Sequence, residues 1–377
     1  MGVDIQQTSA MPGDGRGTSA AAPSLAPHTD GQPAQREPEL ACTGPQAKGS
    51  DRGRPLEEQP GHELIVPHSD SAFALILEAR RRLEFACSLP VSAPPFREQI
   101  AKIRLLIREA CDLSSEVSLA TGLLHPDGRY SIRHSVDVAV ACQIVGRTIE
   151  MREADLTSMV CAALTMNISM LDLQDTLHTQ LLPLSTVQHQ TIQEHPAQGE
   201  ALLRTLGVDD ELWLKAVLYH HAAVDRSGHS LSKNTDEESP IAAELISLAD
   251  VYYARTSTRA NRPALGPTTV LKMLFLGEGS PLREGSAPQF IKDLGIFPPG
   301  TAVRLRNGEI GVVIGRGKKP SAPQVCAVTD SEGMPLLTPV IRDTRKPQFT
   351  VSRVLEWSAV GNPPSMRSLW GKVAAET

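Results

Sequence analysis

The spacing of apolar residues changes once along this chain, and that change limits what the chain can fold into. From about residue 70 to residue 295, apolar residues recur at helical spacing, as in FALILEARRRLEF at 73–85. After Pro298-Pro299-Gly300 they alternate with polar residues, and Asn307-Gly308 is a strong hairpin signal. The pattern predicts a mainly α chain that ends in a small β-rich appendage.

The first 68 residues differ from the rest in composition. They are rich in Pro, Gly, Ser, Ala and Gln, and the first aromatic residue of the chain is Phe73. Such a segment buries too little apolar surface to offset its ordering entropy, so we expect residues 1–68 to be disordered. The rest divides into an N-terminal helical region (69–125), a main helical domain (126–297), the β-rich appendage (298–360) and a C-terminal tail (361–377).

Individual helices are predicted by the same spacing. We expect them at 130–145, 156–171, 213–221 and 241–254. Pro196 fits the first turn of a further helix, which runs through Leu203 and ends at Gly207.

Composition excludes several classes of protein. The formal net charge of -6 and the pI of about 6.0 argue against a general binder of nucleic-acid polymers. The N-terminus lacks the basic lead and apolar core of a secretory signal. The longest uncharged apolar stretch, 156–171, is shorter than the roughly 20 residues of a membrane span. The six scattered cysteines form no CxxC pair and indicate reduced thiols, so we expect a cytoplasmic protein without a membrane span.

Four histidines and one aspartate in the helical region are candidate metal ligands: His134, His195, His220, His221 and Asp250. Imidazole and carboxylate together suit Zn, Fe, Mn or Ni. Asp250 stands in a largely apolar helix, where a buried carboxylate needs a cation, a metal or several donors. Side chains at adjacent helix positions point about 100° apart, so His220 and His221 can reach neighbouring positions.

Each histidine also has a purely structural interpretation. His134 can be a polar residue near a helix start, and His195 can be the N-cap before Pro196. His220 and His221 can interact as cations with a helix C-terminus. Spacing in the sequence does not decide between these interpretations and a metal site.

Five segments, in order, resemble motifs of the HD-GYP family. They are 130–136 (YSIRHSV), 194–199 (EHPAQG), 220–230 (HHAAVDRSGHS), 248–254 (LADVYYA) and 297–305 (FPPGTAVRL). The second resembles the family's His-Pro-x-x-Gly element, and the fourth its Ile-Ala-Asp-x-x-Asp-Ala helix. The resemblance covers about residues 126–345 and implies the helical bundle of an HD domain. The Ala, Arg and Pro usage is typical of a high-GC bacterium.

Active members of this family hydrolyse cyclic di-GMP with two or three metal ions, commonly iron or manganese. The resemblance implies that the five candidate ligands match family ligands, and that Arg259 and Arg262 match basic residues near the ligand phosphates. The family's tyrosine between those arginines is Asn261 here. Its Gly-Tyr-Pro loop, associated with docking of diguanylate cyclase domains, is Gly228-His229-Ser230, which argues against that protein partner.

The sequence departs from the family at its His-Asp pair. Residues 162–170 (AALTMNISM) align with Leu-Leu-His-Asp-Ile-Gly-Lys, so that Met166, Asn167 and Met170 replace the histidine, aspartate and lysine. A thioether is a poor ligand for hard or borderline ions, and a neutral amide cannot bridge two dications as a carboxylate does. We therefore expect no normal two-metal centre.

The loss is unequal between the two metal positions. The first keeps His134 and Asp250 but loses two ligands, whereas the second keeps His195, His220 and His221. Three histidines and a water are enough to hold one Zn²⁺.

Three functions remain open on this evidence. The first is a degenerate, catalytically inactive HD-GYP protein that binds cyclic di-GMP or a signalling partner. The second is a cyclic di-GMP phosphodiesterase with a reduced site for one Zn, Fe or Mn ion. The third is an interaction module without a ligand.

Overall fold

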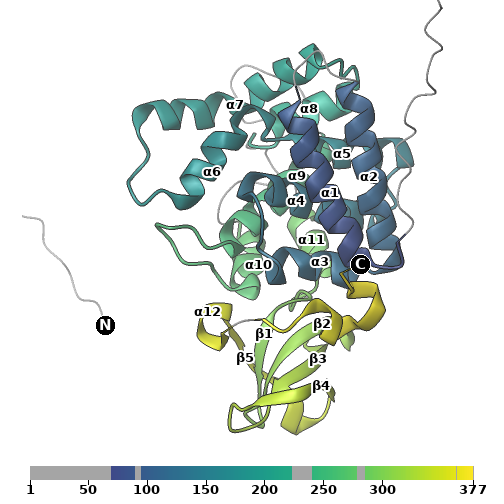
Figure 1. Ribbon diagram of the computed structural model, residues 1–377, viewed down its shortest axis with the longest axis vertical. Coiled ribbons are helices and arrows are strands. Elements are labelled where there is room, and N and C mark those ends of the chain that lie inside the picture. The colour runs from purple at the N-terminus through teal and green to yellow at the C-terminus, as the bar shows by residue number, and fades with distance from the viewer. Residues whose placement is uncertain (1–68, 90–94, 223–239, 278–284, 362, 377) are drawn as a thin grey trace, which may run out of the picture. The chain divides into compact units, whose positions relative to one another are not determined.

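The computed structural model describes residues 69–89, 95–222, 240–277, 285–361 and 363–376. The expected disorder of residues 1–68 lies outside the described residues. The described residues belong to one compact unit. As predicted, this unit is mainly helical and ends in a small antiparallel sheet (Figure 1).

The helical part is built around one fully buried helix, α4 (Tyr130–Thr148), whose residues from Tyr130 to Gly146 are all buried. A helix that is buried on every side belongs to the centre of a core. Helices from both sides of α4 in the sequence pack against it. In chain order the others are α1 (Ala72–Ser88), α2 (Phe96–Leu113), α3 (Ser115–Leu124), α5 (Glu153–Thr165), η1 (Ile168–Met170), α6 (Leu171–Thr179), α7 (Thr186–Thr205), α8 (Glu211–Tyr219), α9 (Ile241–Thr256), α10 (Pro267–Phe275) and α11 (Ser286–Leu294).

Two of the predicted helices differ from the structure. The helix expected at 156–171 ends earlier, because α5 stops at Thr165 and Asn167 leaves helical geometry with φ -107° and ψ 16°. The helix expected to begin at Pro196 begins ten residues earlier, at Thr186. There Ser185 and Gln188 form a capping box, a strong helix start. Pro196 therefore lies inside α7.

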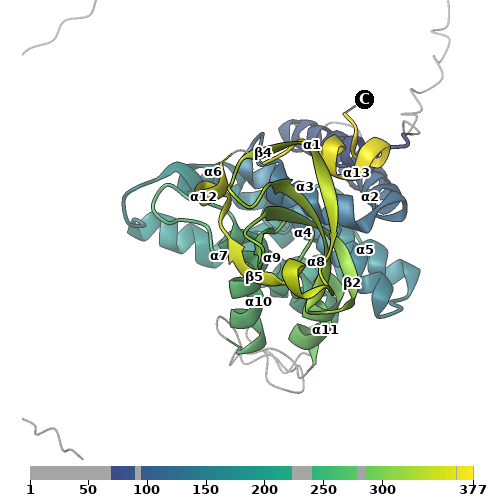
Figure 2. The ribbon, with the colours of Figure 1, turned by 90° about the horizontal axis from the view of Figure 1, so that it is seen from below.

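The sheet has the strand order β4-β3-β2-β1-β5, and all its pairs are antiparallel. Its strands are β1 (Ala302–Leu305), β2 (Ile310–Lys319), β3 (Ala322–Thr329), β4 (Pro335–Asp343) and β5 (Val351–Leu355), with a 3₁₀ turn η2 (Pro347–Phe349) before β5. The hairpin predicted at Asn307-Gly308 joins β1 to β2, and Gly308 has φ +98°. Figure 2 views the unit from the side of the sheet.

The sheet contributes to two apolar clusters, because alternate residues of a strand point to opposite faces. Val312 and Ile314 join the helical core, whereas Val313 packs with Val303 and Val325 in a small separate cluster. The sheet is thereby joined to the helices through one of its faces.

The segment after the sheet forms short helices, which are α12 (Trp357–Val360), α13 (Met366–Trp370) and η3 (Gly371–Ala374). Two indole N–H groups fix it, since Trp357 donates to Gly300 O at 3.1 Å and Trp370 donates to Ile314 O at 2.9 Å. The side chains of Met366 and Leu369 enter the helical core.

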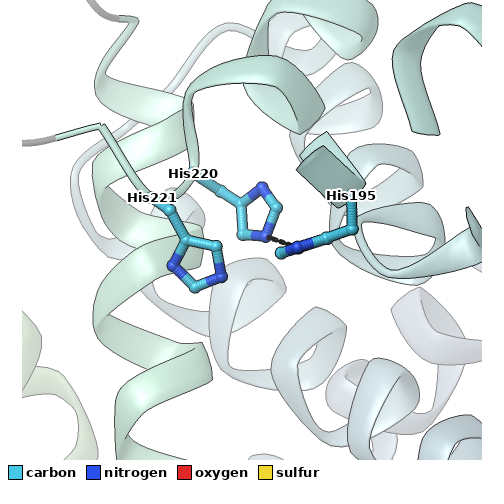
Figure 3. A group of neighbouring side chains, drawn as sticks. All are labelled: His195, His220 and His221. Atoms are coloured by element: carbon cyan, nitrogen blue, oxygen red, sulfur yellow. Dashed lines mark hydrogen bonds between the residues drawn. The ribbon is translucent and has the colours of Figure 1, made fainter. Parts of the chain in front are cut away.

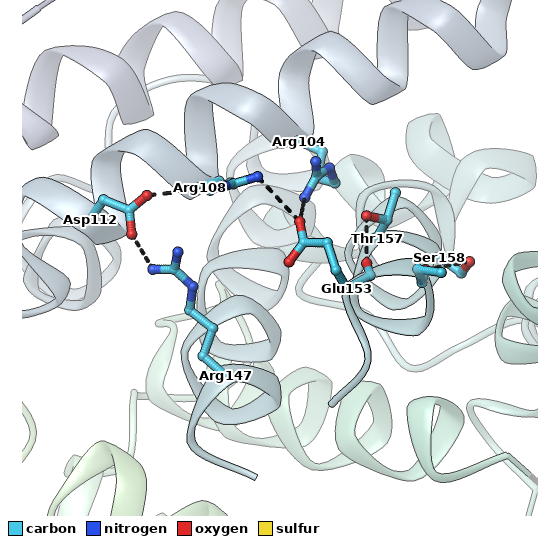
Figure 4. Close-up of polar contacts among 8 residues, drawn as sticks. Arg104, Arg108, Asp112, Arg147, Glu153, Thr157 and Ser158 are labelled. Carbon is cyan, nitrogen blue, oxygen red and sulfur yellow. Dashed lines mark hydrogen bonds and ion pairs between the residues drawn. The ribbon is translucent and has the colours of Figure 1, made fainter. Parts of the chain in front are cut away.

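Ion pairs on the surface connect α2 with the neighbouring helices (Figure 4). Arg104 and Arg108 of α2 both reach Glu153 of α5, at 3.3 and 3.2 Å. Asp112 at the end of α2 pairs with Arg147 of α4. Most of these groups are partly exposed, so each pair adds at most about 1 kcal/mol, but together they hold α2 in register with α4 and α5.

One described segment, Glu153–Thr179, is long and apolar enough to cross a membrane by length and composition alone. In the structure it is divided into α5, η1 and α6, and 61% of its apolar window is buried inside the molecule. A core helix of this kind meets the same criteria as a membrane span. The cytoplasmic location stays a prediction.

Candidate metal centre

His195 lies inside α7 and is completely buried. Proline has no N–H, so Pro196 leaves the carbonyl of Ile192, four residues earlier, without its helical donor. The His195 ring takes that place, with Nδ1 2.6 Å from Ile192 O. A carbonyl oxygen only accepts hydrogen bonds, so Nδ1 carries the proton and Nε2 keeps a lone pair. The His-Pro sequence thus fixes both the orientation and the tautomer of His195.

His220 is oriented in the same way by a helix end. It is the C-cap of α8, completely buried, and its Nδ1 lies 2.7 Å from Val217 O. Val217 O is one of the last carbonyls of the helix, which lack an intrahelical donor. His220 therefore also donates from Nδ1 and presents the lone pair of Nε2.

The two free lone pairs face each other. The Nε2 atoms of His195 and His220 lie 3.2 Å apart (Figure 3). Burial lowers the pKa of His195 to about 4 and lowers that of His220 well below its ordinary value, with a further contribution from the neighbouring His221 in both cases. Both rings are therefore neutral near pH 7. Two hydrogen-bond acceptors this close repel each other unless a cation lies between or beside them. The lowered pKa values disfavour a proton as that cation.

His221 completes the group from the turn after α8. Its ring centroid lies 4.2 Å from that of His220 and 5.1 Å from that of His195. Each of the three histidines offers a nitrogen, and these atoms lie within 4.8 Å of one another. His221 is exposed, so the group has two buried members and one at the surface. Because α8 ends at Tyr219, His220 and His221 are not adjacent helical residues, and the angular separation expected between their side chains does not apply.

His134 and Asp250 form a separate pair between α4 and α9. His134 Nε2 lies 2.6 Å from Asp250 Oδ1, and the two side chains are 1% and 13% exposed. Burial alone would raise the pKa of the Asp250 carboxyl, but the hydrogen bond with His134 holds that pKa below its ordinary value. The carboxylate is thus ionised, and His134 is its direct partner.

The turn with Met166 and Asn167 lies against the helix that carries His195. A Cβ atom on Gly199 of α7 would stand 3.7 Å from Met166 O and 3.6 Å from Ser169 Oγ. The Ser169 hydroxyl donates to His195 O at 2.9 Å. Met166 and Asn167 are both buried, and the amide oxygen of Asn167 has no partner among the described residues.

A comparison with protein families matches the part of the chain that carries these residues. The sequence profile described as HD domain matches residues 113–282. That range contains all five candidate ligands and the motif segments that carry them, in the order of the family. Residues 113–282 of this chain are therefore similar to HD domains.

Two curated relatives are phosphodiesterases. The chain is 25% identical over 281 residues to the cyclic di-GMP phosphodiesterase PA4108 of Pseudomonas aeruginosa, a match that covers 70% of this chain and 66% of that protein. It is 28% identical over 136 residues to the 3′3′-cGAMP-specific phosphodiesterase 3 of Vibrio cholerae, a match that covers 36% of this chain and 29% of that one. The matches therefore span less than two thirds of either relative.

A solved structure, that of the HDG"Y"P protein Bd1817 from Bdellovibrio bacteriovorus, also matches. It has a TM-score of 0.46 and 13% sequence identity, and the match covers 58% of this chain and 70% of that one.

The two arginines predicted to lie near ligand phosphates differ in their contacts. Arg259 and Arg262 face each other in a tight turn, joined by backbone hydrogen bonds of 2.9 and 3.0 Å. Arg262 Nη2 donates to Ala254 O at 2.7 Å, at the end of α9. The Arg259 guanidinium lies 5.9 Å from the Tyr130 ring centroid, and its Nε has no described partner. Of the two, Arg262 is the one whose guanidinium donates to backbone carbonyls among the described residues.

Three further side chains near His134 were not predicted from the sequence: Tyr130, His178 and Arg133. Tyr130 stacks on His178 at 4.1 Å and lies 5.4 Å from His134. The guanidinium carbon of Arg133 lies 5.0 Å from the centroid of the Tyr130 ring. Tyr130 and Arg133 belong to the motif segment of HD-GYP proteins that contains His134, but His178 has no signal in the sequence.

The altered Gly228-His229-Ser230 segment lies outside the described residues. Its interpretation as a lost docking loop stays a prediction.

Proposed function

We propose that this chain is a catalytically degenerate HD-GYP protein that binds a cyclic dinucleotide and holds one divalent metal ion at His195, His220 and His221. The observation that carries the proposal is the pair of neutral imidazoles whose Nε2 lone pairs face each other at 3.2 Å. Their Nδ1 protons are donated to backbone carbonyls, which is how proteins commonly orient metal-ligating histidines.

The donor set fits a divalent ion of intermediate softness. Two nitrogens bound at 2.0–2.1 Å in a tetrahedral site are roughly 3.3 Å apart, close to the distance between His195 and His220. His221 supplies the third nitrogen and faces the surface, which leaves room for a water or ligand oxygen. Such an ion would supply positive charge for a phosphate oxygen.

A second ion lacks its ligands. Met166 and Asn167 replace the residues that would supply a nitrogen and a bridging carboxylate. The Asn167 amide oxygen, although unpartnered among the described residues, is neutral and cannot offset the repulsion between two dications. The remaining pair, His134 and Asp250, is in direct contact at 2.6 Å, and two ligands alone do not make a second metal site. We infer that two-metal hydrolysis is lost.

The ligand class follows from the relatives and from Arg259. The two relatives are phosphodiesterases for cyclic di-GMP and 3′3′-cGAMP by name, so a cyclic dinucleotide is the ligand we propose. The Nε of Arg259, which has no partner among the described residues, suits a phosphate group, because arginine binds phosphate through parallel N–H donors.

A second candidate is a slow phosphodiesterase that uses the single ion. The three-histidine group favours it, since one metal with an open position can support hydrolysis in other zinc enzymes. Both candidates bind the cyclic dinucleotide, but only the second hydrolyses it.

Calorimetry and product analysis with cyclic di-GMP test the proposal on purified, metal-loaded protein. We expect saturable binding without conversion to linear product. Arg259→Ala should weaken binding by about tenfold, the loss expected when a charge-assisted hydrogen bond is removed. Arg255→Ala, which removes a charge from a neighbouring exposed arginine, is the matched control and should have little effect.

Turnover that His220→Ala abolishes would replace the proposal by the second candidate. A complete absence of binding would contradict both candidates and favour an interaction module without a ligand.

A further inference from the structure

A cavity of about 430 Å³ lies between the helices and the sheet. Its walls come from the end of α3, from Arg133 of α4, from residues 256–258 and 263–267 between α9 and α10, and from Gly300 and Trp357. None of the five candidate metal ligands lines it. Its volume lies in the range of roughly 300–1,000 Å³ that is typical of sites for small molecules.

Arg133 is the unusual member of this wall. Arg133 is only 7% exposed, yet its guanidinium forms no hydrogen bond or ion pair with any residue that the structure describes. Asp137 is the charged residue with the largest effect on the pKa of Arg133. Its carboxylate is already paired with Arg80 Nη2 at 2.8 Å. The Tyr130 ring, 5.0 Å from the guanidinium carbon, gives only a cation–π contact.

Such a group is costly in a structural role, because a buried charge without a partner loses hydration that nothing replaces. Burial accordingly lowers the pKa of Arg133. A binding site is the usual place where a protein keeps a buried guanidinium open, since the ligand then supplies the anion.

Further donors line the same cavity. The hydroxyl groups of Ser257 and Thr258 line the cavity, and neither has a hydrogen-bond partner among the described side chains or backbone. One guanidinium and two hydroxyls are three separate donor groups, which match the three terminal oxygens of a phosphate monoester better than the two of a carboxylate. Arginine pairs with phosphate through two parallel hydrogen bonds.

Part of the lining is apolar. It contains Leu123, Pro126, Leu265 and the indole of Trp357. The Trp357 N–H is held by Gly300 O at 3.1 Å, so the ring offers a preset surface for a planar group. Glu356, exposed at the edge of the cavity, disfavours ligands with a second negative charge at that end.

We propose that this cavity binds a small organic phosphate monoester with a planar ring, of the size of a nucleoside monophosphate. Arg133, Ser257 and Thr258 hold the phosphate, and the ring lies against Trp357. The site is additional to the metal centre, and the inference does not depend on the function proposed for that centre.

Equilibrium binding of adenosine and guanosine 5′-monophosphate to metal-depleted full-length protein tests this site. We expect saturable binding that is at least about tenfold tighter than that of the free nucleosides or inorganic phosphate, because only the monophosphates combine phosphate contacts with ring contacts. Arg133→Gln and Thr258→Val should each weaken it, the first by about tenfold or more. Arg255→Gln, an equal loss of charge on an exposed residue outside the cavity wall, should not.

Two variants distinguish binding in this cavity from binding at the histidines and from a structural role of Arg133. His220→Ala should leave monophosphate binding unchanged, whereas loss of binding in that variant would place the ligand at the histidines and overturn the proposal. Arg133→Gln should melt at the same temperature as the wild type or higher, since it removes an unpaired buried charge. A lower melting temperature together with unchanged binding would show that Arg133 is structural. Absence of monophosphate binding to the wild type would also overturn the site.

Discussion

His195 and His220 each donate one ring N–H to a backbone carbonyl and keep the other nitrogen for their shared contact. The structural interpretations given to them from the sequence have different outcomes. His195 is inside a helix and not an N-cap. His220 does lie at a helix C-terminus, but its pKa is lowered well below the ordinary value, so it is no cation for the helix dipole.

The lowered pKa values of His195 and His220 predict how the stability of the metal-depleted protein depends on pH. The ordinary histidine pKa is 6.5, and in the folded protein the pKa is about 4 for His195 and lies well below the ordinary value for His220. The unfolded chain therefore binds more protons than the folded one between these values, and stability falls as the pH falls. The free energy of unfolding should decrease by up to about 1.4 kcal/mol per pH unit for each residue, from about pH 6.5 downwards.

Urea denaturation at a series of pH values measures this slope. His220→Gln should make the slope shallower, because one of the two groups no longer titrates. His189→Gln, at an exposed position of α7, is the matched control and should leave the slope unchanged. If His220→Gln and wild type show the same slope, the pair is not held neutral by the fold.

The candidate ligands themselves could be predicted from residue type and motif, but their grouping could not. Whether His134 joins His195 depends on contacts between helices that are distant in sequence. The structure pairs His134 with Asp250 and leaves the three other histidines together. The role of Pro196 also escaped prediction, since a proline usually marks a helix start, whereas here it frees Ile192 O for His195.

At the scale of elements, α8 places His220, and its start is set by one side chain. Asp210 is the N-cap, with Oδ1 accepting from the Trp213 N–H at 3.0 Å and Oδ2 accepting from the Ser158 hydroxyl at 2.7 Å. The second contact joins α8 to α5. Asp210 therefore fixes both the beginning of the helix and its position relative to the turn at Met166.

Asp210→Ala should lower the free energy of unfolding by about 1 to 2 kcal/mol, as for the loss of other N-caps. Asp210→Asn should cost much less, because the amide oxygen still caps the helix and Asn ranks with Asp as an N-cap. Chemical denaturation of the three proteins measures the difference. Equal destabilisation by Ala and Asn would mean that the negative charge, and not the cap, holds α8.

The elements with clear local signals were predicted well. The spacing of apolar residues located α4, α8 and α9 to within a few residues, and Asn307-Gly308 located the β1–β2 turn. Prediction failed at the end of α5, where the apolar pattern continues past Thr165 but the backbone turns at Asn167. That turn brings Met166 against α7, a contact that depends on tertiary packing.

At the scale of the whole molecule, the sheet is joined to the helical part by buried contacts of β2 and by the indoles of Trp357 and Trp370. The sequence predicted the fold class and the change to strands, but it predicted residues 361–377 to be a tail. In the structure α13 and η3 within that range pack on the core. Short helices with few apolar residues carry little periodic signal, so their packing could not be foreseen.

The central claim is that the ligands for one metal ion persist while those for a second are gone. The metal content of purified protein, loaded with Mn²⁺, Fe²⁺ or Zn²⁺ and then desalted, tests it most directly. We predict one ion per chain in the wild type, none in His220→Ala, and two in the double variant Met166→His and Asn167→Asp, which restores the family's pair. Two ions in the wild type, or none, would contradict the account.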